Sequence, residues 1–205
     1  RTSEDLYKTE YHILAADIGG TNSRFAYFRA NNAGELELIS HVWLKTAAAE
    51  SFADLLQNLR DSDFQFDPRQ ADIVGIAIAG PITKGLRGNP PLIPWEIDIT
   101  RAKLDYGFQR SILINDFVAQ AFSCISPIGK SAEIILAGAP EPLSTIAVIG
   151  AGTGLGKAIL VPDDRDGGYS AAPSEGAHAC FPFVGEREFA LQRFLISSRR
   201  TNYAT

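Results

Sequence analysis

The 205-residue sequence contains no methionine, although an average composition would supply several. We therefore expect the natural protein to carry residues that this sequence lacks, which a mass measurement tests. Cysteine is nearly absent, and Cys124 and Cys180 are too few for a disulfide framework or a repeated metal-ligand spacing. The first ten residues are polar and do not resemble a signal peptide. These absences favour a reducing, cytoplasmic location.

Positive charge is also scarce. The net charge is −5, so the sequence lacks the excess of positive charge that is typical of proteins that bind nucleic acid. No apolar run approaches the ~20 residues that a membrane-spanning helix needs. We expect neither nucleic acid nor a membrane as a partner. The content of 45% hydrophobic and 21% charged residues is ordinary for a globular protein of one or two domains.

A repeated pattern dominates what is present: an apolar strand, a tight turn with Gly-Thr, and a second apolar strand. The first copy spans residues 12–28 and the second spans residues 146–161. Glycine lets backbone amides approach a ligand closely, and successive amides in such a turn form a concavity that binds anions. The duplication predicts a polyphosphate held from both sides of a cleft.

Hydrophobic periodicity predicts an α/β layer fold that begins with a hairpin, a third strand and a helix. In the first predicted helix, Phe52, Leu55, Leu56 and Leu59 form an amphipathic face. The predicted strands are 12–16, 24–29, 36–44, 73–79, 111–115, 133–137, 146–150 and 157–161, and the predicted helices are 49–61, 117–124 and 184–197.

Two aspartates lie where strand patterns end, and each has two interpretations. Asp17 precedes the first glycine turn and could hold Mg²⁺ through its water shell, or could bond to local backbone amides. Asp116 follows a buried strand pattern and could cap the next helix. It could equally act as a general base at the carboxyl end of a strand, where open α/β sheets place their ligands.

A third polar cluster runs from Ser174 to His178. The side chains of Glu175 and His178 could both bond to vicinal hydroxyl groups. With Cys180 they also suggest a metal site, but a structural zinc site usually needs four ligands. The loop from Asn89 to Trp95 is rich in proline, and rigid loops that carry an aromatic suit the wall of a small-ligand pocket.

Five motifs together resemble the bacterial glucokinase family, within the hexokinase–actin-like ATPase superfamily. They occur in the family's order and span nearly the whole sequence. The motifs are Ala16–Asn22, Ile78–Ile82, Ile114–Phe117, Gly150–Gly156 and Glu175–His178. The resemblance implies two ribonuclease-H-like α/β domains that close over ATP and a hexose. The first would cover residues 11–115, and 116–205 would begin a larger domain that is incomplete here.

The resemblance also implies roles for individual residues. Asp116 matches the catalytic base, and Asn115, Glu175 and His178 match residues that hold sugar hydroxyls. Asp17 matches the carboxylate that organises Mg²⁺. The two phosphate loops correspond to Ala16, Asp17, Ile18, Gly19, Gly20, Thr21 and Asn22, and to Gly152, Thr153 and Gly154. The implied activity is transfer of phosphate from ATP to the 6-hydroxyl of glucose.

The sequence departs from the family's pattern in three ways. Aligning on Trp95 puts Pro91 and Leu92 where the family's sugar loop usually has Thr-Asn, and Ala177 replaces a glycine. The family's chains are also much longer. These departures leave two alternatives open: a non-catalytic sugar-binding or regulatory relative, and a kinase for another hexose.

The apolar tail from Val184 to Ile196 needs a surface to cover. We expect either a second copy of the chain, giving a homodimer, or residues beyond Thr205 to provide it, and we favour the second. The 205 residues alone are accordingly not expected to be a competent kinase.

Overall fold

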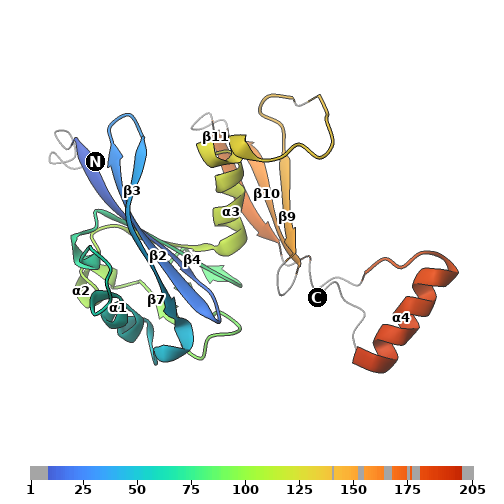
Figure 1. The fold of residues 1–205 in the computed structure, drawn as a ribbon, viewed down its shortest axis with the longest axis horizontal. Helices are drawn as coiled ribbons and strands as arrows, with labels where there is room; N and C mark the ends of the chain where they lie inside the picture. The colour runs from blue at the N-terminus through green and yellow to red at the C-terminus, as the bar shows by residue number, and fades with distance from the viewer. Residues whose placement is uncertain are drawn as a thin grey trace. The chain divides into compact units, whose positions relative to one another are not determined.

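The computed structural model describes residues 9–139, 141–151, 155–163, 168–174, 176 and 181–199, except the side chains of Lys130 and Arg199. The chain divides into two compact units, Arg1–Asp116 and Phe117–Thr205. Both combine helices with a sheet, so the protein is of the mixed α/β class (Figure 1).

A mixed five-stranded sheet forms the centre of the first unit, in the order β3-β2-β1-β4-β8. The first three strands are antiparallel neighbours, while β4 and β8 run parallel to β1. Alternate residues of β1 (Leu14, Ala16 and Ile18) are buried in the core. The strands are β1 (Glu10–Ile18), β2 (Asn22–Asn31), β3 (Leu36–Lys45), β4 (Ile73–Ile78) and β8 (Ser111–Asn115).

Helix α1 (Phe52–Arg60) confirms the helix predicted from periodicity. Its four predicted apolar residues are all buried in the core of the first unit. The Ser51 hydroxyl accepts a hydrogen bond from the Asp54 amide at 3.1 Å, which satisfies one of the free amides at the start of the helix. Figure 1 shows α2 (Ala102–Asp105) beside α1.

Short elements that the periodicity did not predict connect β4 to β8. Strands β5 (Ile82–Thr83), β6 (Arg87–Gly88) and β7 (Ile97–Asp98) form a small antiparallel sheet. Elsewhere in the first unit, two further short elements flank α1 in the sequence: the 3-10 turns η2 (Thr46–Ala48) and η3 (Pro68–Gln70). Two-residue strands are too short for alternation to reveal them.

The second unit contains a three-stranded antiparallel sheet in the order β11-β10-β9, with helix α3 packed on it (Figure 1). Ala121 of α3 and Ala158 and Leu160 of β10 form its buried core. Its elements are α3 (Asp116–Cys124), η4 (Pro127–Ser131), β9 (Ile146–Ala151), β10 (Leu155–Asp163), β11 (Gly168–Ser174) and α4 (Gly185–Arg199).

The strand predicted over residues 133–137 is wrong. These residues are irregular, and Ile134, Ile135 and Leu136 are 79%, 94% and 89% exposed. A short apolar run becomes a strand only where a neighbouring strand edge is available to pair with it. Strand β11 was missed because its sequence, GYSAAPS, has no alternation of apolar and polar residues. Among the described residues, no helix is long and apolar enough to span a membrane.

Candidate functional site

Three strand ends of the first unit lie in one row across the sheet. Ile18 of β1 pairs with Ile78 of β4, and Ile78 pairs with Asn115 of β8. Adjacent strands lie about 4.8 Å apart, so the ends of β1 and β8 are about 10 Å apart. The first glycine turn follows Ile18, and Asp116 follows Asn115. The fold therefore brings two of the predicted motifs to the same edge of the sheet.

The first glycine turn joins β1 directly to β2. Within it, the Gly19 amide donates to the Asn22 carbonyl at 3.1 Å. The amides of Gly20 and Thr21 donate to no residue that the structure describes. Two unused amides side by side in a tight turn are suited to an anion.

Thr46, the first residue of η2 directly after β3, supports this turn, and nothing in the sequence had indicated it. Its hydroxyl donates to the Gly19 carbonyl at 2.6 Å and lies 2.9 Å from the Ser23 hydroxyl. Its amide donates to the Thr21 carbonyl at 3.2 Å. Both hydroxyl groups belong to fully buried residues. The adjacent Lys45 donates from Nζ to Asn22 Oδ1 at 2.9 Å.

Asp17 lies on the sheet face opposite to Ile18 and pairs in register with Arg24 of β2. The Arg24 guanidinium is 2.7 Å from the Asp17 carboxylate, and both side chains are about half exposed, at 51% and 46%. Arg24 also lies over the Trp43 ring, 4.6 Å from its centroid. The carboxylate predicted to organise Mg²⁺ therefore has an arginine as its partner here.

A proline-rich loop packs on the glycine turn. A Cβ at Gly20 would lie 2.6 Å from the Leu92 Cβ, so only glycine allows Leu92 this close. Pro91 lies against Gly80, whose φ of +88° also favours glycine. The Trp95 indole is buried and donates to the Ala49 carbonyl at 3.0 Å, which anchors the loop to the core.

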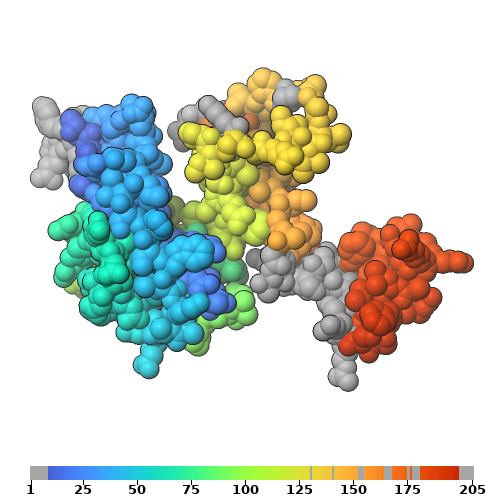
Figure 2. All heavy atoms as spheres, viewed as in Figure 1, coloured from blue at the N-terminus to red at the C-terminus, as the bar shows by residue number. Residues whose placement is uncertain are grey.

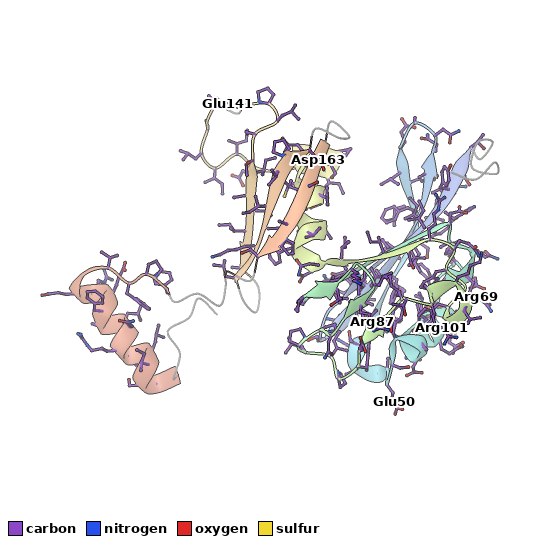
Figure 3. The ribbon with its side chains drawn as sticks, turned by 180° about the vertical axis from the view of Figure 1, so that it is seen from behind. Glu50, Arg69, Arg87, Arg101, Glu141 and Asp163 are labelled. Carbon is purple, nitrogen blue, oxygen red and sulfur yellow. The ribbon has the colours of Figure 1, made fainter. Side chains whose placement is uncertain are left out.

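Asp98 of β7 contacts residues on both sides of this loop. Its carboxylate accepts hydrogen bonds from the Thr100 hydroxyl at 2.6 Å and from the Thr100 amide at 2.8 Å. Arg87 is the cross-strand neighbour of Asp98 on β6 (labelled in Figure 3), and its Nε lies 2.9 Å from Asp98 Oδ2. The hydrogen bond from the Thr100 hydroxyl is the largest of the effects that lower the pKa of Asp98.

Asn115 and Asp116 complete the edge. The Asn115 side-chain amide donates to the Gly80 carbonyl at 3.3 Å, so Gly80 contacts both the proline-rich loop and the end of β8. Asp116 is the first residue of α3. A continuous set of contacts thus runs from Gly20 through Leu92, Pro91 and Gly80 to Asn115.

Asp17 is the carboxylate at this edge that could take part in binding a magnesium ion. No three His, Cys, Asp or Glu side chains among the described residues come together as metal ligands. Mg²⁺ bound with a nucleotide keeps several waters and needs only one or two carboxylates besides phosphate oxygens. Asp17, half exposed beside the glycine turn, meets that requirement.

Several predicted residues lie outside the described part of the chain: Gly152, Thr153 and Gly154 of the second turn, and Glu175 and His178. Gly176 is described, and its carbonyl accepts a hydrogen bond from Lys157 Nζ at 3.2 Å. Its amide donates to the Ser174 hydroxyl, also at 3.2 Å. Lys157, which sequence reasoning had not singled out, therefore ties the polar motif to β10.

A cavity of about 670 Å³ lies elsewhere in the first unit, between α1 and α2. None of the predicted site residues lines it. Its lining includes Arg60, Arg69, Leu104 and Tyr106. Arg69 is labelled in Figure 3 and marks the position of the cavity on the first unit. The functional site is therefore assigned from the strand ends and not from the volume of this cavity.

The mixed α/β sheet that carries the glycine turn and the strand-end Asn-Asp pair has the fold of solved glucokinase structures. The structure is similar to that of a glucokinase from an Antarctic psychrotroph, with a TM-score of 0.73 and 27% identity, covering 96% of this chain and 59% of that one. A glucokinase from Balamuthia mandrillaris, solved in complex with glucose, shares the fold at 20% identity and a TM-score of 0.68, covering 95% of this chain and 58% of that one.

The chain belongs to the glucokinase family, whose sequence profile matches residues 14–202. A glucokinase of Nostoc punctiforme is 30% identical over 184 residues, which are 90% of this chain and 52% of the relative. A glucokinase of Nitrobacter hamburgensis is 35% identical over 180 residues, or 85% and 52% of the two chains. The chain thus spans about half the length of the curated relatives it matches.

Proposed function

We propose that this protein is part of an enzyme that transfers phosphate from ATP to the 6-hydroxyl of glucose. One observation carries the proposal: the glycine turn with two unused amides and the Asn115–Asp116 pair share one edge of the sheet. Membership of the glucokinase family supports it. In this proposal the two units begin two ribonuclease-H-like domains that close over the substrates.

The proposed roles follow from the chemistry of each group. Asp116 accepts the proton of the sugar 6-hydroxyl as the hydroxyl oxygen attacks the terminal phosphorus of ATP, the bond from that phosphorus to the bridging oxygen breaks, and ADP leaves. The amides of Gly20 and Thr21 donate to phosphate oxygens, and Asp17 holds water molecules around Mg²⁺. The metal ion, when bound, offsets negative charge on the phosphoryl group in transfer.

Other residues enter the proposal from the family resemblance. Asn115, Glu175 and His178 would hold sugar hydroxyls, and Gly152, Thr153 and Gly154 would form the second phosphate turn. Within this motif, the described residue Gly176 is held to β10 by the hydrogen bond from Lys157 Nζ to its carbonyl.

The test is an assay of ADP release with and without glucose, on the longest natural chain that contains these residues. Asp116→Asn keeps the shape of the side chain but removes the base, so we expect turnover to fall by about 10²–10⁴-fold with an unchanged circular dichroism spectrum. Asp105→Asn is the matched control, since Asp105 is an exposed helical aspartate 3.4 Å from Arg101. Normal turnover by folded Asp116→Asn would contradict the assigned base.

A second candidate is a sugar-binding relative without kinase activity. Leu92 favours it, because this side chain is 67% exposed and apolar where the family's sugar loop usually has asparagine. Glucose binding by calorimetry without glucose-dependent ADP release would support this candidate. Replacing glucose with other hexoses in the same assay tests the third alternative, a different acceptor.

A further inference from the structure

The ring of Phe117 lies against two glycines of the hairpin formed by β9 and β10. A Cβ at Gly156 would overlap the ring at Cε2, Cζ and Cδ2, and a Cβ at Gly150 would lie 3.0 Å from Cε1 and Cζ. The two glycines oppose each other in the register of the hairpin. They therefore form a flat seat, without side chains, for one aromatic ring.

Backbone conformation does not explain these glycines. Gly150 and Gly156 lie inside strands, and neither is among the described glycines with positive φ. A residue with a side chain could adopt the same backbone. What requires glycine at both positions is the space that the Phe117 ring occupies.

The ring belongs to the face of the sheet that α3 covers. On that face β10 presents Gly156, Ala158 and Leu160, and the last two are buried. On β9 the same face carries Ile146 and Val148, which pack on the core of the unit together with Phe117. The glycine pair continues this apolar face toward the turn between the strands, where larger side chains would exclude the ring.

Two features of the chain give this contact a mechanistic meaning. Phe117 directly follows Asp116 in the first turn of α3. Gly150 and Gly156 directly flank the segment that contains Gly152, Thr153 and Gly154. The ring therefore joins the helix that begins at the proposed base to the two strands that lead into the proposed second phosphate turn.

We propose that Phe117 is a positioning residue for Asp116, and that Gly150 and Gly156 serve as its seat and not as phosphate ligands. The proposal rests on the proposed function. Moving a reacting group by about 1 Å costs about 10²-fold in rate, so a displaced ring reduces turnover while substrate binding stays intact.

The test uses the longest natural chain and three variants. In Gly156→Ala the new methyl group displaces the ring, and we expect kcat to fall about 10²-fold with KM for ATP and sugar changed less than about threefold. Gly168→Ala is the matched control, because nothing lies within 4 Å of a Cβ at this glycine of β11. It should leave kcat, KM and stability unchanged.

The double variant Phe117→Leu, Gly156→Ala separates positioning from general damage. A smaller side chain leaves room for the methyl group, so the double variant should recover at least about tenfold in kcat over Gly156→Ala alone. Amide hydrogen exchange in the first turn of α3 gives a readout independent of activity. It should accelerate in Gly156→Ala, but not in Gly168→Ala.

The outcomes distinguish the two proposals. An unchanged kcat in Gly156→Ala, a KM effect confined to ATP, or no recovery in the double variant would each overturn the positioning role of Phe117. Full turnover in Asp116→Asn would instead overturn the assignment of Asp116 as the base, and with it the positioning role of Phe117. A wild-type chain that releases no ADP in response to glucose would overturn the proposed function. Faster exchange in α3 of Gly156→Ala would in either case still report the contact between the ring and its seat.

Discussion

The hydroxyl of Thr46 donates a hydrogen bond of 2.6 Å to the carbonyl of Gly19. This bond joins η2, which directly follows β3, to the first glycine turn. Because the Thr46 hydroxyl also contacts Ser23 and the Thr46 amide donates to the Thr21 carbonyl, one buried residue holds the turn on both sides. The conformation of the turn thus depends on a residue 27 positions further along the chain.

Replacing Thr46 with valine keeps the volume of the side chain but removes its hydroxyl. The Gly19 carbonyl and the Ser23 hydroxyl then lose their buried partner, so we expect the free energy of unfolding to fall by about 1–3 kcal/mol. Urea unfolding at pH 7 measures this. Thr83→Val is the control: Thr83 is exposed on β5, and its replacement should change stability by no more than about 0.5 kcal/mol.

The Asp17–Arg24 pair predicts how magnesium dependence responds to mutation. An ion pair with both side chains half exposed contributes about 0–1 kcal/mol, so Mg²⁺ and its waters can replace Arg24 as the partner of the carboxylate. We expect Arg24→Gln to lower the Mg²⁺ concentration for half-maximal turnover by no more than about fivefold. Asp17→Asn should have the opposite and larger effect: it should raise the Mg²⁺ concentration for half-maximal turnover.

Titrating turnover with Mg²⁺ at saturating ATP tests both variants. Arg29→Gln is a control, because Arg29 forms a similar exposed pair with Glu37 away from the turn. If Asp17→Asn titrates like the wild type, Asp17 has no part in binding the metal ion.

Replacing Leu92 with asparagine should increase the affinity for sugar. An asparagine there would place an amide beside Gly20, where Leu92 now exposes an apolar side chain. One added hydrogen bond contributes about 0.5–1.5 kcal/mol, so Leu92→Asn should lower KM for glucose by up to about tenfold. Leu104→Asn, at another exposed leucine, should leave KM unchanged. An unchanged or higher KM for Leu92→Asn would show that the loop does not contact the sugar.

Protonation of Asp98 should lower the free energy of unfolding in acid. Its pKa is lowered in the folded protein, chiefly by the Thr100 hydroxyl, so its carboxylate is favoured by folding. This contribution is present above the unfolded pKa of about 3.9 and is lost as the pH falls through the lower, folded value. Thr100→Val should raise the pKa of Asp98 and make stability below about pH 4 less dependent on pH.

Carboxyl chemical shifts of Asp98 and urea unfolding between pH 7 and pH 3 measure this change. The Thr83→Val control should keep the wild-type acid dependence. A pKa of Asp98 that is the same in Thr100→Val and the wild type would contradict the role of the hydroxyl.

The sequence predicted those elements whose apolar residues follow a regular period. Helix α1 and strand β1 were recognised because each has one buried face. The glycine turn and the Asn115–Asp116 pair were recognised as motifs because they occur with three others in the order typical of the glucokinase family; each by itself had a structural alternative. Residues 133–137 were predicted wrongly, because an apolar run has the same composition whether or not a partner strand exists.

In the space-filling view, β3, drawn in light blue, forms part of the surface of the first unit (Figure 2). The exposed Trp43 of this strand had no motif to mark it, and its role beside Arg24 depends on the register between β2 and β3. Register is set by pairing between distant segments, so no local pattern contains it.

The amino-acid sequence by itself therefore determined the local elements, the motifs and the family to which they belong, because these depend on residue type and spacing. Tertiary structure alone decided which groups meet: Thr46 with Gly19, Leu92 with Gly20, and Phe117 with the glycines at 150 and 156. Each of these contacts joins residues at least 27 positions apart in the chain. Such contacts form only when strand pairing and close packing bring the segments together, and packing selects side chains by the shape of the space that is left.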